Sequence, residues 1–196
     1  MQDPRQLYTF APDQPDEGEL DGPVLVHALN GFIDAGSAVR LAAESLLSQL
    51  EHSVVATFDL DQVYDYRARR PPMTFTEDRW TSVEQPRLEL ILVRDLTGRG
   101  FLLLTGPEPD VQWERFVAAV RQLVQHYGVS LTLGIHAIPM AVPHTRPLGI
   151  TAHGNRQDLI RKYPTWVGTV QVPGHAAAQM LLKAAPKWPE RELHVH

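Results

Sequence analysis

The chain has 196 residues, of which 43% are hydrophobic and 21% are charged, and it contains no cysteine. This length suits one domain with a sizeable core, and the lack of cysteine excludes disulfides and zinc-thiolate sites. The formal net charge of −5 arises in residues 1–22, which hold six acidic residues and one arginine, so the rest of the chain is neutral.

A neutral body provides no basic field, and we therefore expect no general nucleic-acid binding. No apolar run reaches the roughly 18 residues of a membrane span, and the first residues lack the pattern of a signal peptide. We expect a cytoplasmic protein with no membrane contact. Residues 1–22 are predicted to be an acidic, solvated lead-in, and residues 23–196 a single α/β domain.

The first half of the domain begins with a βαβ unit. An apolar run over Val24–Leu29 predicts a buried strand, an apolar stripe over Ser37–Gln49 a helix, and Ser53–Phe58 a second strand. The following segment, Asp59–Pro72, mixes acids, tyrosines and arginines, and it is predicted to be a long ordered loop. An edge strand is expected over Arg79–Val83.

An antiparallel hairpin is predicted next, because Leu88–Val93 and Phe101–Thr105 flank the turn sequence Asp95–Gly100. The strongest helix signal covers Val111–Tyr127, with Asp110 as its cap. The remaining expected elements are strands at Leu131–Ile135, Gly149–Ala152 and Gly168–Val172, helices at Asn155–Lys162 and His175–Ala185, and a proline-rich loop at His136–Pro147. Together these elements predict a mixed sheet with helices on both faces.

Two segments at strand ends form the candidate functional cleft. The turn GFIDAG follows the first strand, the His136–Pro147 loop follows another, and strand ends of an open sheet tend to meet at one edge. The candidate residues are Gly31, Phe32, Asp34, Gly36, His136, Pro139, His144 and Arg146. A glycine turn before a helix can bind an anion, but Asp34 would repel one, so a tight structural junction or a protein contact is the favoured interpretation.

Other chemistry has little support in the sequence. The histidines follow no known zinc spacing, and no serine lies in a GxSxG motif. Asp59, Asp61 and Asp65 lie close together but lack the glycine and final glutamate of a calcium loop, which favours a solvated loop. We therefore predict no cofactor, no metal and no catalytic residue.

The Asp59–Pro72 loop supplies a candidate protein interface, because tyrosine and arginine are enriched at such surfaces. Its members are Tyr64, Tyr66, Arg67, Arg69 and Arg70. A simpler alternative is that the arginines pair with the aspartates of the same loop.

Four segments taken together resemble one family: GFIDAGSA, FDLDQVYDYRARRPPM, LTGPEPDVQWERF and GIHAIPMAVPHTRP. They resemble the proteasome assembly chaperone 2 family in its actinobacterial branch. The resemblance implies a mixed α/β sheet similar to the phosphorylase/hydrolase-like fold, and it implies a homo-oligomer, most simply a trimer. Eukaryotic relatives help to assemble proteasome α-rings, so proteasome subunits are possible partners.

The chain departs from that family at its end. The chaperones dock through a tail of a hydrophobic residue, a tyrosine and any residue, whereas this chain ends Leu193-His194-Val195-His196. The last residues resemble the start of a family strand that continues, so we expect that a further C-terminal portion is lacking.

Two function hypotheses follow. In the first, the protein is a non-enzymatic, chaperone-like protein that acts through contacts in a homo-oligomer. In the second, it is a hydrolase or a phosphorylase-like enzyme that gathers Asp34, His136, His144 and Arg146 in a pocket at the strand C-termini. One cavity holding all four groups would favour the enzyme, and their scatter would favour the first hypothesis.

Overall fold

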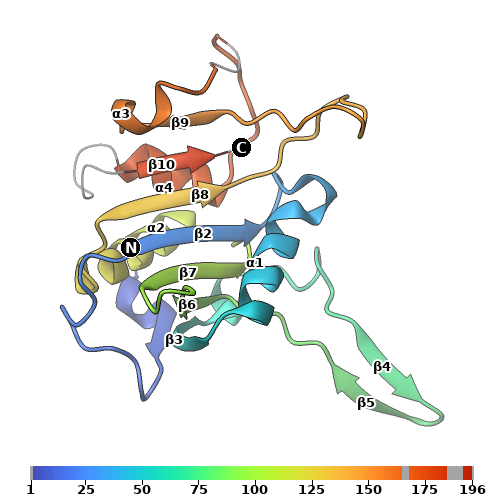
Figure 1. Cartoon of the computed structure of the whole chain (residues 1–196). Coiled ribbons are helices and arrows are strands. Elements are labelled where there is room, and N and C mark those ends of the chain that lie inside the picture. The colour runs from blue at the N-terminus through green and yellow to red at the C-terminus, as the bar shows by residue number, and fades with distance from the viewer. Residues whose placement is uncertain (1, 165–167, 185–191, 196) are drawn as a thin grey trace.

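The computed structural model describes residues 2–164, 168–184 and 192–195, which form a sheet with helices on both faces (Figure 1). The strands are β1 (Tyr8–Phe10), β2 (Val24–Asn30), β3 (His52–Phe58), β4 (Met73–Thr76), β5 (Arg79–Val83), β6 (Glu89–Arg94), β7 (Gly100–Pro107), β8 (Leu131–Ile135), β9 (Ala152–Gly154) and β10 (Glu192–Val195). The helices are α1 (Ala38–Gln49), α2 (Trp113–His126), α3 (Gln157–Ile160) and α4 (Ala176–Ala184), with short 3-10 turns at Pro4–Leu7, Ala35–Ser37 and Leu60–Gln62.

The main sheet is mixed, with the order β1-β3-β6-β7-β2-β8-β10-β9. Strands β1, β3, β6 and β7 pair antiparallel, whereas β7, β2, β8 and β10 pair parallel, and β9 closes the edge antiparallel to β10. The predicted β6–β7 hairpin is present, and the predicted mixed α/β sheet is confirmed.

Both faces of the sheet are buried, because apolar residues occupy successive positions of the central strands. In β7, Leu102 and Leu104 belong to the core beneath α2 and α4, while Leu103 belongs to the separate core beneath α1. Successive side chains of β7 therefore enter opposite cores. This explains why the strand is a continuous apolar run and does not alternate between apolar and polar residues.

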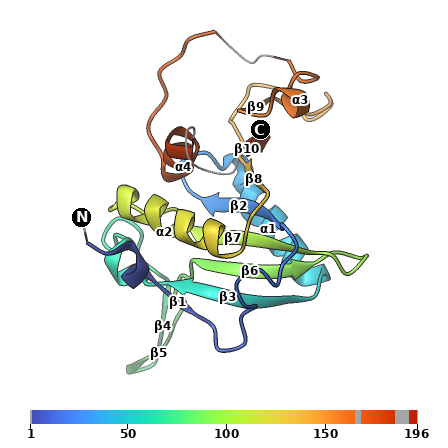
Figure 2. The same cartoon turned by 90° about the vertical axis from the view of Figure 1, so that its left-hand side faces the viewer.

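Helix α2 packs its apolar face on the sheet as predicted. Phe116, Val120 and Leu123 are fully buried, whereas Trp113 is partly buried at the start of the helix. Gly128 follows the helix with a φ of 59°, a left-handed conformation that glycine adopts without strain. Helix α4 lies beside α2 (Figure 2) and adds Ala177 and Met180 to the same core.

The start of the chain is more structured than a solvated lead-in. Strand β1 pairs with β3, and Leu7 and Tyr8 are buried in the main core. Arg115, itself buried on α2, donates hydrogen bonds to the carbonyl oxygen of Asp3 and to the side chain of Gln2. The acidic composition of residues 1–22 does not indicate that these few apolar residues are buried, because their burial depends on a distant helix.

Three predicted strands differ from the structure. Strand β5 pairs with β4 in a separate hairpin that projects from the body (Figures 1 and 2), so it is not an edge of the main sheet. The strand expected at Gly149–Ala152 is instead β9, which begins at Ala152. The strand predicted at Gly168–Val172 is wrong, since residues 168–172 form no ladder. Short strands at the end of the chain depend on tertiary partners that local sequence does not reveal.

We expect Phe116→Ala to lower the free energy of unfolding by about 3–5 kcal/mol, because it empties a fully buried site between α2 and the sheet. Denaturant-induced unfolding followed by circular dichroism measures this change. The control is Leu96→Ala in the β6–β7 turn, where the side chain is 94% exposed and the expected loss is under about 1 kcal/mol. Equal losses in the two variants would contradict the position of Phe116 in the core.

Candidate functional site

The GFIDAG turn and the start of the His136–Pro147 loop lie side by side. They follow the parallel neighbours β2 and β8, and Asp34 forms a β-bridge with Ala137. The amide of Ala35 donates to the carbonyl oxygen of Ala137 at 2.9 Å, and the amide of Ala137 donates to Ile33 at 3.3 Å. The parallel register therefore brings together two segments that are about 100 residues apart in the chain.

Asp34 is engaged at the start of α1. Its Oδ1 atom accepts a hydrogen bond from the amide of Val39 at 2.7 Å, and this bond satisfies one of the free amides of the helix N-terminus. Gly36 has a φ of 64°, a left-handed conformation that lets the chain turn between Asp34 and the helix. The carboxylate thus caps the helix from three residues before its N-cap residue, Ser37.

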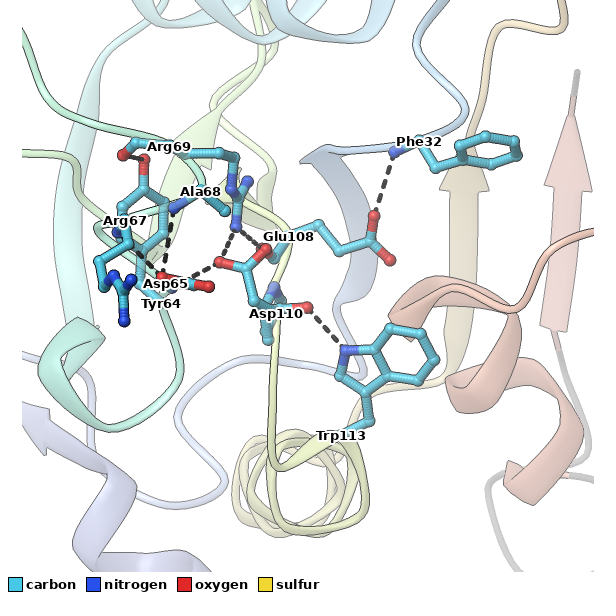
Figure 3. A network of polar contacts seen from close by, with 10 residues as sticks. Phe32, Tyr64, Asp65, Arg67, Ala68, Arg69, Glu108, Asp110 and Trp113 are labelled. Carbon is cyan, nitrogen blue, oxygen red and sulfur yellow. Dashed lines mark hydrogen bonds and ion pairs between the residues drawn. The ribbon is translucent and has the colours of Figure 1, made fainter.

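Glu108, which follows β7, connects the turn to α4. Its carboxylate accepts a hydrogen bond from the amide of Phe32 at 3.2 Å (Figure 3). It also accepts one from the amide of Ala176 at the start of α4. A Cβ atom on Gly31 would lie 2.7 Å from the Cβ atom of Glu108, so this position requires glycine. Sequence analysis missed Glu108, although its place directly after a strand could have indicated it.

Buried histidines gather on the α4 side of the sheet. His27 of β2, His136 after β8 and His175 before α4 are all buried, with ring centroids 5.8 Å apart for His27 and His136 and 5.4 Å apart for His136 and His175. Burial, together with a smaller effect of nearby His175, lowers the pKa of His27 to about 3. Burial also lowers the pKa values of His153 and His175, while Glu108 acts in the opposite direction on His175. The rings of His27, His153 and His175 are therefore uncharged at neutral pH.

A cavity of about 820 Å³ opens beside these histidines. Phe32, His136 and Pro139 of the candidate cleft line it, together with residues of β9, α3 and α4. Gly31, Phe32 and Asp34 line a second hollow of about 540 Å³, which they share with Glu108 and Asp110. Gly36 lines neither hollow.

The four groups of the enzyme hypothesis do not share a cavity. His136 lines the larger one and Asp34 the smaller one, whereas His144 and Arg146 are exposed and line neither. Within their loop, Ala137 and Ile138 are half-buried, but Met140 and Val142 are exposed. The arrangement of these groups lacks a matched acid and base.

Arg69 and Tyr64, which the sequence assigns to an interface, take part in an internal network (Figure 3). Nη2 of Arg69 donates to Oδ2 of Asp110 at 2.6 Å and to the carbonyl oxygen of Glu108, and its guanidinium lies 4.4 Å from the ring centre of Tyr64. The Tyr64 hydroxyl donates in turn to the carbonyl oxygen of Arg69 at 2.8 Å. This network anchors the long loop to the end of β7.

The other candidate interface residues lie at the surface. The Tyr66 hydroxyl donates to Oδ1 of Asp61 at 2.9 Å, and the side chains of Arg67 and Arg70 are exposed. The alternative is that the arginines pair with aspartates of their own loop. Arg69 does not do so, because its partner Asp110 lies 41 positions away in the chain.

Among residues 2–164, 168–184 and 192–195, no group of three or more histidine, aspartate or glutamate side chains is arranged to hold a metal ion. In the part of the chain that the structure describes, no helix is both long and apolar enough to cross a membrane.

The sequence profile of the PAC2 family matches residues 28–187, which span both segments of the candidate cleft and the network at Arg69. The chain belongs to the PAC2 family. Family membership accounts for the four segments on which the resemblance rests. No functionally curated protein matches the chain at a significant level.

Solved structures of actinobacterial proteins share the fold. Rv2714, a Mycobacterium tuberculosis protein of unknown function, is 44% identical with a TM-score of 0.89, over 96% of this chain and 66% of that one. A Corynebacterium glutamicum protein of unknown function is 36% identical with a TM-score of 0.89, over 97% and 71% of the two chains. The M. tuberculosis proteasome-assembly chaperone homologue Rv2125 is 20% identical with a TM-score of 0.77, over 88% and 73%.

The buried histidines predict acid-sensitive stability. A lowered pKa means that the unfolded chain binds more protons than the folded one, so stability falls as the pH drops below about 6.5. As the pH falls from about 7 to about 5, the free-energy cost of keeping His27 neutral should lower the unfolding free energy by about 2 kcal/mol. We expect His27→Gln to lose correspondingly less over this range in denaturant titrations, whereas the exposed control His52→Gln should follow the unmodified protein. The same pH slope in both variants would disprove this role.

Replacing Arg69 should weaken the anchor of the long loop. We expect Arg69→Met to lower the unfolding free energy by about 1.5–3 kcal/mol, because its charge-assisted bonds to Asp110 and Glu108 are lost. Arg87→Met is the matched control, since its side chain is mainly exposed and its pairing with Glu89 lies at the surface. An unchanged midpoint for Arg69→Met in thermal unfolding would show that the network does not stabilise the fold.

Proposed function

We propose that this PAC2-family protein is a chaperone-like protein that acts through protein–protein contacts as a homo-oligomer, without catalysing a reaction. The observation that carries the proposal is the β4–β5 hairpin. All nine residues of its two strands are exposed, and it projects away from the main sheet (Figure 1). Such an arm is suited to contact another protein.

The hairpin has one apolar face. Met73 pairs with Val83 and Phe75 pairs with Trp80 across the two strands, and the rings of Phe75 and Trp80 lie 5.2 Å apart. Phe75 is 53% exposed and Trp80 is 63% exposed. A two-stranded hairpin alone is marginally stable in water, and an exposed apolar patch of this kind commonly marks an interaction site. A partner that covers this face would stabilise the hairpin as well as the complex.

The exposed apolar residues of the loop after β8 add a second surface of the same character. They are Met140, Val142, Leu148 and Ile150. The exposed guanidinium groups of Arg67 and Arg70 lie a few residues before the hairpin, and arginine is common at protein interfaces. These features support the proposal that the Asp59–Pro72 loop and the neighbouring hairpin contribute to an interface.

The enzyme hypothesis has one supporting observation, the cavity at the strand C-termini. Its proposed groups are divided between two hollows and the surface, and Asp34 is engaged as a helix cap. This scatter favours the non-enzymatic proposal. A hydrolase or phosphorylase-like activity stays the second candidate because the cavity could accept a substrate.

The fold shared with a proteasome-assembly chaperone homologue supports proteasome subunits as candidate partners. The family resemblance supports a trimer as the oligomer. We propose that contact with such partners uses the hairpin and loop surfaces.

A trimer of 22.0 kDa chains should have a mass of about 66 kDa in size-exclusion chromatography with light scattering at micromolar concentration. We expect the double substitution Phe75→Ser and Trp80→Ser to shift this mass towards that of the single chain while circular dichroism stays unchanged. Leu96→Ser likewise replaces an exposed apolar side chain with a polar one, but in the β6–β7 turn, and it should leave the oligomer intact. A 22.0 kDa monomer in the unmodified protein would refute the assembly.

The chaperone role is tested by capture from a lysate of the native cell, scored by mass spectrometry for proteasome α-subunits. The intact protein should enrich them, and the hairpin variant should not. Capture of α-subunits that the hairpin variant retains in full would exclude the hairpin as the contact surface, and no enrichment by either would argue against the role itself.

A further inference from the structure

The larger cavity has the size and walls of a small-molecule site. Its volume of about 820 Å³ lies within the roughly 300–1,000 Å³ of ligand pockets. It opens between the ends of β2 and β8 on one side and β9, α3 and α4 on the other. The walls are mainly apolar, and they include Phe32, Ile138, Ile160, Val170, Val172 and Leu181.

The described residues that line the cavity carry positive and no negative formal charge. Among the described residues that surround the cavity there is no aspartate, glutamate or lysine, and Arg161 supplies the formal charge. Arg161 is exposed, so its guanidinium lies at the mouth and not at the floor. The nearby carboxylate of Asp158, whose pKa Arg161 helps to lower, lies outside this lining and is paired with Arg156. A cation at the mouth would face Arg161.

Two buried histidines lie at the floor. His136 and His175 are both more than nine-tenths buried, and both line the cavity. Nδ1 of His175 accepts a hydrogen bond from the amide of Ala178 at 3.3 Å, so the proton of the neutral ring lies on Nε2. A charged ligand group would lose its hydration beside these buried rings, which favours the mouth as the place for the charge.

We propose that this cavity binds a small amphipathic carboxylate, with its apolar body along the walls and its carboxylate beside Arg161 at the mouth. The apolar body covers Val170 and Val172, which are exposed on the walls of the cavity. The carboxylate keeps part of its hydration while it pairs with the guanidinium, so binding avoids the cost of a buried ion. The site uses no residue of the β4–β5 hairpin, and it is independent of the assembly proposed above.

Displacement of the fluorescent probe dansyl-undecanoic acid from the full chain tests the proposal, with decanoate and decanol as competitors. Both should displace the probe saturably, and decanoate should bind more tightly than decanol. Arg161→Gln should weaken decanoate binding roughly two- to fivefold and leave decanol binding unchanged. Lys162→Gln is the matched control, because Lys162 is the next residue in the chain but does not line the cavity; it should change neither affinity.

A second variant fixes the location of the site. Ala178 lines the cavity from α4, and Ala178→Trp should abolish binding of both competitors while the circular dichroism spectrum is retained. The proposal is overturned if decanoate fails to displace the probe, if Arg161→Gln affects decanoate no more than Lys162→Gln does, or if a folded Ala178→Trp variant binds as the unmodified protein does.

Discussion

The parallel pairing of β2 with β7 on one side and β8 on the other is the constraint on which the rest of the molecule depends. Its register sets Asn30 opposite Pro107 and His27 opposite Gly134, so the segments that follow these strands leave the sheet together. Gly31 therefore lies against Glu108, and the bridge between Asp34 and Ala137 forms without any long connection. A shift of one residue would turn every side chain of β2 to the opposite face and separate all of these contacts.

Glu108 extends this constraint from the sheet to the helices. Its carboxylate joins the amide of Phe32 to the first amide of α4, while its carbonyl oxygen accepts from Arg69 of the long loop. One residue thus holds three segments that are distant in sequence, and Figure 3 shows its contacts with Phe32 and Arg69. The negative charge of Glu108 at the start of α4 also interacts favourably with the helix dipole. This interaction stabilises the position of His175 at the inner end of the cavity.

The molecule separates two kinds of surface. The cavity lies at the strand C-termini, and burial lowers the pKa values of His153 and His175 in its lining, whereas the exposed apolar residues of the hairpin lie on a projecting arm. Mixed α/β sheets often carry ligands at strand ends, and a projecting strand pair is available for contacts with other chains. A protein that works through assembly can therefore retain a ligand site without using it for catalysis, which accords with the scatter of Asp34, His144 and Arg146.

Local sequence determined the elements whose signals are long and periodic. The helix predicted over Val111–Tyr127 is α2, which buries Phe116 and Val120, and the apolar run over Val24–Leu29 predicted the buried strand β2. The strand–turn junctions also predicted that the GFIDAG turn and the segment after β8 would meet, because both follow parallel strands. Tertiary structure decided the rest. Leu7 and Tyr8 are buried by a helix more than 100 residues away, Arg69 pairs with Asp110 and not with its own loop, and β5 pairs with β4 outside the sheet. In each case the partner lies far along the chain or outside the local pattern, and short-range periodicity carries no record of that distance.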